Sequence, residues 1–360
     1  MSKSRHLRLV RFPDIQLGNG PRWLIKNLIP LYGLVLVWGS PKTGKSFWLF
    51  DALMHVVLGR SYRGLRVTQG PVVYVVAEGA EGFKSRVEAF RQHKMDAAED
   101  GCDFLILPAR LDAIADQERL INLIKQELGT RKPIAVAFDT VARTLNGPEN
   151  SNDAMGEYVD AMDAVRDAFQ CAVIMVHHSG VDGNRPRGAS CLTGAVDAQL
   201  AVRRHGNGVI SVLVDEMKDG PDGAVFHSRL EKVVVGTDED GEDITSCIVS
   251  DLDGESISYT QEPRVSPQAA RAYDILRELI DEEGVPPPEG GDLPESVSGV
   301  SRKLWRDRCK MAELAGSKDV EAFKKAFLRS RKALLEASLI GIKDENFVYL
   351  MGGQEPFSPM

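Results

Sequence analysis

The eight residues Gly39-Ser-Pro-Lys-Thr-Gly-Lys-Ser46 constrain the fold of this chain more than any other feature. The apolar run Leu34–Trp38 precedes them and the amphipathic stretch SFWLFDALMHVVLG follows, which predicts a strand, a loop and a helix in that order. The glycines let backbone N–H groups curl around phosphate oxygens, and the first turn of the helix adds further donors. The pattern predicts a phosphate-binding loop, or P-loop, formed by Gly39, Ser40, Pro41, Lys42, Thr43, Gly44, Lys45 and Ser46.

Two side chains of this loop have the chemistry that a nucleoside triphosphate needs. Lys45 is expected to reach the β- and γ-phosphates of ATP, and Ser46 is expected to ligate Mg²⁺. The stretch PIAVAFDT places Asp139 directly after an apolar strand, and we expect Asp139 to hold the same ion through water. The alternative is an ordinary strand-end aspartate that caps a loop, which is the weaker reading once the P-loop is accepted.

Hydrolysis also needs a group that orients or deprotonates the attacking water. The stretch VVYVVAEG places Glu78 at the end of the next strand, on the edge of the sheet where ligands of open α/β sheets bind. We expect Glu78 to act as general base or to position the water. Glu81 is the competing carboxylate, but it is expected to begin the following helix.

Short apolar runs alternate with helical stretches from about residue 31, which predicts an α/β core with a mostly parallel sheet. After about residue 195, strands joined by Asp-Gly turns predict an antiparallel extension of that sheet. We expect a basic N-terminal extension over residues 1–30 and an ATPase domain over 31–262. The expected parallel strands are Leu34–Trp38, Val72–Val76, Phe104–Leu107, Ile134–Phe138 and Ala172–Val176.

Residues 263–360 are expected to form a small α+β domain that resembles a winged helix. Ser266 and Pro267 have the types expected at the N-cap and first position of a helix. A Pro/Gly-rich loop over 284–299 precedes two further helices, near 301–315 and 319–338, and LIGIKDENFVYLM then predicts two strands joined by a turn. The expected core residues are Leu304, Cys309, Met311, Leu314, Phe323, Phe327, Leu334 and Leu335.

Charge is distributed unevenly along the chain. The formal net charge is -8, yet residues 301–332 hold eleven Lys and Arg against four acids. Such a face suits contacts with DNA phosphates, and the alternative is a solvated basic face or a protein-interaction surface. The expected DNA contacts of this domain are Arg302, Lys303, Arg306, Lys324, Lys325 and Arg329.

Three further properties bear on where the protein works. The apolar runs fall short of the roughly 20 residues that span a bilayer, and the basic start lacks the long apolar core of a signal peptide. The five cysteines are scattered, without CxxC spacing. We therefore expect a cytoplasmic protein that does not bind a membrane.

Four motifs together resemble those of RecA-like ATPases, most closely the RepA-type plasmid and phage replicative helicases. They are the P-loop, AEG, FDT and VHHSG…RGAS, and the resemblance covers about residues 20–235. It implies a ring, usually a homo-hexamer, that binds ATP between subunits and passes single-stranded DNA through its pore. Glu78 matches the catalytic glutamate of that family.

The stretch VIMVHHSG ends in two adjacent histidines, His177 and His178. Consecutive strand residues point to opposite faces, so one metal ion cannot easily take both rings. The resemblance implies that His178 contacts the γ-phosphate and relays its loss to DNA-binding loops, and that His177 is structural. A strand-end pair without function is the alternative.

The glycine-rich segment that follows the histidines carries Arg185 and Arg187. By resemblance these arginines meet phosphates of a DNA strand near the pore of the ring. The alternative is a surface loop with incidental arginines.

The chain departs from the family where a cation is needed to act on the neighbouring subunit's ATP. RepA-type members carry an arginine soon after RG-S, whereas this chain has Ala198–Leu200 at the comparable positions. EMKDGPDG resembles the finger-bearing hairpin of DnaB-like helicases, which makes Lys218 the first candidate, and Arg204 is the second.

Three functions are therefore in competition. The first is an ATP-hydrolysing, ring-forming DNA helicase or translocase acting in replication of a plasmid, phage or mobile element. The second is an ATP-switched DNA-binding regulator or loader with slow hydrolysis, and the third is a RecA-type recombination ATPase. The rate of ATP hydrolysis with and without single-stranded DNA separates the first from the second.

Overall fold

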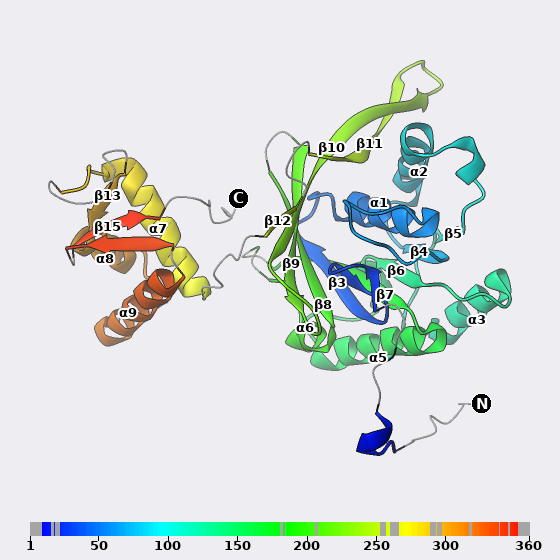
Figure 1. Ribbon diagram of the computed structural model, residues 1–360, viewed down its shortest axis with the longest axis horizontal. Coiled ribbons are helices and arrows are strands. Elements are labelled where there is room, and N and C mark those ends of the chain that lie inside the picture. The colour runs from blue at the N-terminus through cyan, green and yellow to red at the C-terminus, as the bar shows by residue number, and fades with distance from the viewer. Residues whose placement is uncertain are drawn as a thin grey trace. The chain divides into compact units, whose positions relative to one another are not determined.

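The chain divides into two compact units, the first ending at Ser258 and the second beginning at Tyr259. The predicted boundary at residue 262 and parts of the predicted 1–30 extension and 284–299 loop lie outside the described residues. The computed structural model (Figure 1) describes residues 9–351 apart from 16–17, 19–21, 181–182, 184, 206–207, 253–256, 260–265, 289–292, 294–296, 317–318, 338 and 345.

The first unit is built on one large sheet whose strand order is β11-β10-β9-β8-β3-β7-β6-β4-β5. Strands β3, β4, β5, β6 and β7 are parallel, as predicted, and are joined by helical crossovers. β8 was expected in the antiparallel extension, but it pairs parallel with β3 because α6 returns the chain to the same edge before β8 begins. These strands are β3 (Gly33–Gly39), β4 (Val72–Val76), β5 (Phe104–Leu107), β6 (Ala135–Asp139), β7 (Ala172–His178) and β8 (Ala198–Arg204).

The rest of the sheet is the predicted antiparallel extension. β9 pairs with β8 and β10, and β10 continues with β11 as a long hairpin that projects beyond the sheet (Figure 1). β11 was not predicted, because its residues mix polar and apolar types without a clear alternation. The extension comprises β9 (Val209–Met217), β10 (Ala224–Thr237), β11 (Asp243–Asp251) and β12 (Ile257–Tyr259), which pairs with β10.

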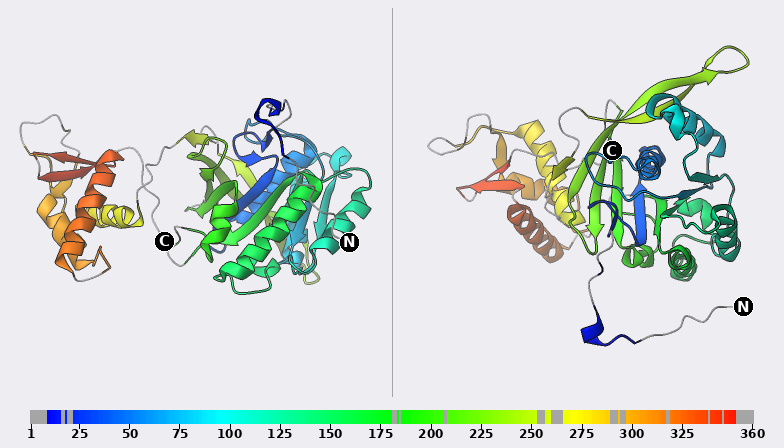
Figure 2. Two further views of the ribbon diagram at one scale, coloured as in Figure 1. Left: turned by 90° about the horizontal axis from the view of Figure 1, so that it is seen from below. Right: turned by 45° about the vertical axis from the view of Figure 1, so that its right-hand side comes forward.

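Helices cover both faces of the sheet, and Figure 2 views the face that α5 covers. α1 and α2 pack with one apolar cluster that contains Trp48 and Phe83, whereas α3 and α5 pack with a second cluster that contains Leu120 and Tyr158. The helices are α1 (Lys45–Leu58), α2 (Ala80–Lys94), α3 (Gln117–Leu128), α4 (Val141–Thr144), α5 (Asn152–Phe169) and α6 (Ser190–Ala195), with 3-10 turns η1 (Phe12–Asp14) and η2 (Ala97–Glu99).

The predicted N-terminal extension over residues 1–30 is wrong in its second half. Strands β1 (Trp23–Ile25) and β2 (Ile29–Pro30) form a small antiparallel pair. Leu24 and Leu28 are fully buried in the cluster that also holds the P-loop helix. The basic residues of this region had suggested an exposed arm. The side chains of Leu24, Ile25, Leu28 and Ile29 nevertheless belong to the core.

The second unit has the element order helix, strand, helix, helix, strand, strand. Its antiparallel strands lie in the order β13-β15-β14, and Trp305 is fully buried at its centre. Ser266 caps α7 by accepting from Ala269 N, as predicted. The elements are α7 (Pro267–Glu283), β13 (Gly299–Ser301), α8 (Arg302–Met311), α9 (Val320–Glu336), β14 (Ile340–Lys343) and β15 (Phe347–Leu350).

Two predicted core residues of this unit lie instead at its surface. Met311 is 72% exposed and Leu335 is 39% exposed. Trp305 had not been predicted in the core, although it directly follows the predicted core residue Leu304 on the same helix. Among the described residues of the chain, none of the helices has the length and apolarity needed to cross a membrane.

Candidate nucleotide-binding site

The predicted P-loop runs from the carboxyl end of β3 into the first turn of α1. A Cβ at Gly39 would meet the Val202 carbonyl oxygen at 2.2 Å, so the neighbouring strand leaves room for glycine alone. Gly44 is the N-cap of α1 at φ +97°, which favours glycine, and a glycine has no side chain to cap the N–H groups of the first turn. These N–H groups are the donors that a phosphate needs.

Lys45 is buried in the loop, where its ammonium donates to the carbonyl oxygens of Gly39 (2.8 Å) and Ser40 (2.7 Å). Burial lowers the pKa of Lys45 to about 8, and the nearby carboxylates of Asp139 and Glu78 oppose that shift. An ammonium at the start of a helix, where the helix dipole is positive, suits a polyphosphate.

Asp139 ends β6 on the buried side of the loop. Tyr74 donates to its Oδ2 across 2.8 Å, and the side chain of Ser46 also forms a hydrogen bond with it. Burial raises the pKa of the Asp139 carboxyl, whereas these hydrogen bonds and the charges of Arg86 and Lys45 lower it. A hydroxyl and a carboxylate are hard oxygen donors of the kind that Mg²⁺ prefers, so the two side chains fit that ion.

Glu78 follows β4, which pairs with β6, and lies at the same edge of the sheet as Asp139. Its carboxylate is 48% exposed and lies 3.5 Å from Nε of Arg143. Glu81 instead lies in the first turn of α2 and pairs with Lys84 at 2.8 Å. Of the two candidates, Glu78 is therefore the one whose charge acts on Lys45.

The two histidines at the end of β7 differ in their surroundings. His178 is half-buried. Its pKa is lowered mainly by burial and further by the positive charge of Lys45, whereas the negative charge of Glu78 raises it. His177 is fully buried on the other face, where its Nε2 donates to the Arg187 carbonyl oxygen at 2.8 Å. The structure thus brings His178, and not His177, into the electrostatic field of the P-loop.

The strand end is also joined to the P-loop by its backbone. Ser179 N donates to the Gly39 carbonyl oxygen at 3.1 Å, and the hydroxyls of Ser179 and Ser40 lie 3.0 Å apart. Among the described residues, no three or more His, Cys, Asp or Glu side chains gather in a way that could hold a metal ion.

The two arginines after the histidines are both tied to the protein. Arg187 Nε lies 2.9 Å from Glu149 Oε2, and Arg187 N donates to the His178 carbonyl oxygen at 2.9 Å. The Arg185 carbonyl oxygen accepts from Gly180 N at 2.8 Å. Both side chains therefore belong to a segment that is fixed to the end of β7.

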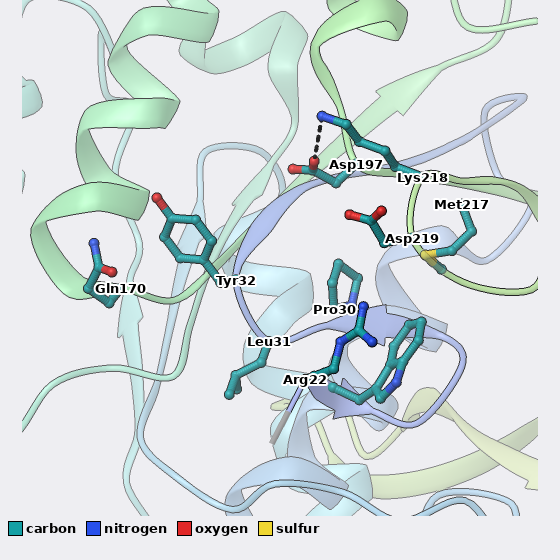
Figure 3. Close-up of a pocket in the computed structure, with 10 residues that line it drawn as sticks. Arg22, Pro30, Leu31, Tyr32, Gln170, Asp197, Met217, Lys218 and Asp219 are labelled. Atoms are coloured by element: carbon teal, nitrogen blue, oxygen red, sulfur yellow. Dashed lines mark hydrogen bonds and ion pairs between the residues drawn. The ribbon is translucent and has the colours of Figure 1, made fainter. Parts of the chain in front are cut away.

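The two candidates for a trans-acting cation lie at opposite edges of the sheet. Lys218 follows β9 at the edge away from the P-loop, where it lies 3.4 Å from Asp197 Oδ1 (Figure 3). It lines a pocket of about 310 Å³ with Arg22, Tyr32 and Asp219. Arg204 ends β8 beside its own P-loop and donates to the Lys42 carbonyl oxygen at 3.2 Å.

The predicted DNA contacts of the second unit lie on α8 and α9. Lys303, Lys325 and Arg329 are exposed, whereas Arg302 is half-buried. Arg306 is within 3.8 Å of Asp307, and Lys324 pairs with Glu321 at 2.7 Å.

Sequence reasoning missed four side chains that support the site. These are Tyr74 and Arg86 beside Asp139, Arg143 beside Glu78 and Glu149 beside Arg187. Arg86 lies with its Cζ 4.3 Å from the ring centroid of Phe47, the residue after Ser46. Tyr74 carried a signal, because it is the one hydroxyl in an otherwise aliphatic strand, VVYVV. The others come from loops and helix faces that only packing brings to the site.

Comparison with known proteins gives one family match. Residues 11–184 match the family model described as an AAA domain. The comparison with curated proteins found no match. Among solved structures, the chain is similar to the "Crystal structure of the RadB recombinase" at 16% identity and a TM-score of 0.39, covering 55% of this chain and 87% of that one. The family match, together with the loop geometry, supports a P-loop ATPase domain.

Proposed function

We propose that the protein is an ATP-hydrolysing, ring-forming DNA helicase or translocase of the RepA type, acting in replication of a plasmid, phage or mobile element. The observation that carries the proposal is the convergence of Lys45, Asp139, Glu78 and His178 at one edge of the sheet. The sheet register supports it, because His178 pairs with Gly39 of the P-loop and Asp139 pairs with the end of the strand that precedes Glu78. ATP is the substrate and single-stranded DNA the partner.

Each side chain at this edge has a defined task in hydrolysis. Lys45 and the N–H groups at the start of α1 hold the β- and γ-phosphates. Mg²⁺, when bound by Ser46 and by Asp139 through water, neutralises phosphate charge. Glu78 orients the attacking water and takes its proton, and the half-exposed position of its carboxylate leaves it accessible to that water.

Single-stranded DNA enters the proposal through the segment after His178. Arg187 is connected to both histidines by backbone hydrogen bonds, so a contact between Arg187 and a DNA phosphate can act on the γ-phosphate site. A positively charged groove that follows the backbone is the usual means of binding a single strand.

The test is the rate of ATP hydrolysis with and without single-stranded DNA. A motor predicts stimulation by DNA, which the Lys45→Ala variant abolishes together with ATP binding. A matched control is Lys84→Ala, because Lys84 is an exposed cation of the same unit that pairs with Glu81 on its own helix. Slow hydrolysis that ignores DNA would reject the motor. Filaments rather than rings in negative-stain images with ATP would favour a recombination ATPase.

A second candidate function is an ATP-switched DNA-binding regulator or loader. The second unit favours it, because its order of helices and strands is that of a winged helix, and Lys325 and Arg329 expose a basic face on α9. In a winged helix the third helix enters the major groove of duplex DNA. Tight binding of duplex DNA together with slow, DNA-independent hydrolysis would select this function over the motor.

A further inference from the structure

The ion pair between Arg187 and Glu149 is uneven in its exposure. Nε of Arg187 lies 2.9 Å from Oε2 of Glu149, and the arginine is 57% exposed whereas the glutamate is 14% exposed. Oε2 is buried, and none of the described residues gives it a hydrogen bond of normal geometry. The negative charge on this buried oxygen is therefore balanced by an arginine at the surface.

This dependence makes the pair sensitive to any anion that competes for Arg187. When a phosphate takes the guanidinium, the buried Oε2 of Glu149 loses its ion-pair partner, which is unfavourable for a charged oxygen shielded from water. The glutamate and its loop must then rearrange or gain water. Loss of the ion pair thus changes the structure around Glu149 as well as the position of Arg187.

The same segment is connected to both histidines and to the Glu149 backbone. His177 Nε2 donates to the Arg187 carbonyl oxygen, and Arg187 N donates to that of His178. Ala189 N donates to the Glu149 carbonyl oxygen at 2.9 Å, and a Cβ at Gly188 would meet that oxygen at 2.5 Å. The backbone at residues 187–189 is therefore packed against Glu149 on one side and the end of β7 on the other.

We propose that Glu149 is a positioning residue that holds Arg187 away from nucleic acid, and that a DNA phosphate binds by displacing Glu149 from Arg187. The displacement is passed to His178 through the Arg187 backbone, and this exchange is the step by which DNA stimulates hydrolysis. The inference rests on the proposed function, because it takes single-stranded DNA as the partner and the His178 site as the point of hydrolysis.

Glu149→Gln tests the exchange, because it removes the charge and keeps the size of the side chain. We expect about a three- to tenfold gain in affinity for an oligothymidylate, since the fraction of Arg187 free to bind rises. Basal ATPase without DNA should rise about two- to fivefold, and stimulation by DNA should shrink. Glu157→Gln is the matched control, because Glu157 is an exposed acid on α5.

Removing a negative charge can raise DNA affinity in two ways, by releasing Arg187 or by reducing electrostatic repulsion of the DNA. A double variant separates these two causes. In an Arg187→Gln background, Glu149→Gln should leave DNA affinity and basal ATPase unchanged, because no arginine is released. The double variant also lacks the unpaired buried charge, so it is expected to fold even where Arg187→Gln does not. An equal gain in both backgrounds would overturn the exchange, as would a Glu149→Gln protein that matches the parent.

The outcomes distinguish this inference from the proposed function. DNA-stimulated hydrolysis in the parent with no effect of Glu149→Gln rejects the exchange and leaves the motor intact. Failure of both proteins to bind oligothymidylate rejects the DNA partner itself, and the exchange with it. Salt titration adds a second readout. The logarithm of the DNA-binding constant falls linearly with the logarithm of salt concentration, and one additional phosphate contact in Glu149→Gln should steepen that slope by about 0.7 for a single strand.

Discussion

The His177 ring donates from Nε2 to the carbonyl oxygen of Arg187 across 2.8 Å, from a position with no exposed surface. A carbonyl only accepts, so this hydrogen bond requires the tautomer with its proton on Nε2. Burial lowers the pKa of His177, which keeps the ring neutral at physiological pH. His177 is therefore a buried support for Arg187, while the neighbouring His178 lies on the P-loop side.

His177→Ala and His178→Ala should consequently differ in kind. Loss of the buried His177 ring and its hydrogen bond should lower the free energy of unfolding by about 2–4 kcal/mol. His178→Ala should change stability little and should reduce the stimulation of ATPase by DNA. Denaturant unfolding and ATPase assays on both variants check this. Equal loss of stimulation, with equal stability, would contradict the separate roles.

Glu78→Gln should separate nucleotide binding from turnover. The amide cannot accept the proton of the attacking water, so hydrolysis should fall by about 10²–10⁴-fold. Affinity for a fluorescent ATP analogue should remain within a few-fold of the parent, because Lys45 and the backbone donors are unchanged. Glu81→Gln serves as the control, since Glu81 lies in the first turn of α2. Full hydrolysis by Glu78→Gln would assign the base elsewhere.

Affinity for ATP should depend on pH through Lys45. Burial lowers the pKa of this ammonium from 10.5 to about 8, so the free protein loses the charge as pH rises through that value. Bound phosphates favour the charged form, so binding takes up a proton above pH 8 and the dissociation constant should increase there. Titration of a fluorescent ATP analogue between pH 6.5 and 9.5 measures this. A flat profile across that range would contradict the lowered pKa.

Much of the first unit follows from sequence, because most of its parallel strands are continuous apolar runs, including the partly buried edge strand β5. Runs such as Val72–Val76 and Phe104–Leu107 need no tertiary context to be recognised as strands, and the structure has the same bounds. The exposed hairpin strand β11 lacks such a run, and its pairing with β10 supplies what its own sequence does not. Residues 23–30 were misjudged because their charge was weighed above their apolar spacing.

The site, like the fold, has residues that the sequence places correctly and residues that only the tertiary structure brings in. Strand-end residues such as Asp139 and Glu78 could be placed, since carboxyl ends of parallel strands share one edge of the sheet. Arg143 comes from the short helix α4 and Glu149 from the loop after it, and Arg86 reaches the site from the side of α2. Such approaches depend on how segments pack, which local patterns do not encode.

The basic face of α9 should bind duplex DNA if the second unit is a winged helix. The double change Lys325→Gln and Arg329→Gln should weaken duplex binding. The slope of the logarithm of the binding constant against the logarithm of salt concentration should become shallower by about 1.8, because two phosphate contacts are lost. ATPase without DNA should not change. Lys132→Gln is a suitable control, because Lys132 is an exposed cation of the first unit. Unaltered duplex affinity would favour a protein-interaction role for this face.

A mixing experiment decides whether Lys218 or Arg204 serves a neighbouring site. Lys218 lies at the edge of the sheet away from its own P-loop, so in a ring it can act only on the ATP of another subunit. Lys218→Ala and Lys45→Ala proteins should each be inactive alone, and their mixture should regain hydrolysis. In the mixed ring, a Lys218→Ala subunit keeps its own P-loop and receives Lys218 from a Lys45→Ala neighbour.

Arg204 gives the contrasting result, because its guanidinium donates to the Lys42 carbonyl oxygen of its own loop. If Arg204 supports that loop in cis, mixing Arg204→Ala with Lys45→Ala restores nothing, since each subunit carries one damaged site. Recovery in the Arg204 mixture and none in the Lys218 mixture would make Arg204 the trans-acting cation. The assay thereby assigns the role by complementation, independently of how far either single variant lowers the rate.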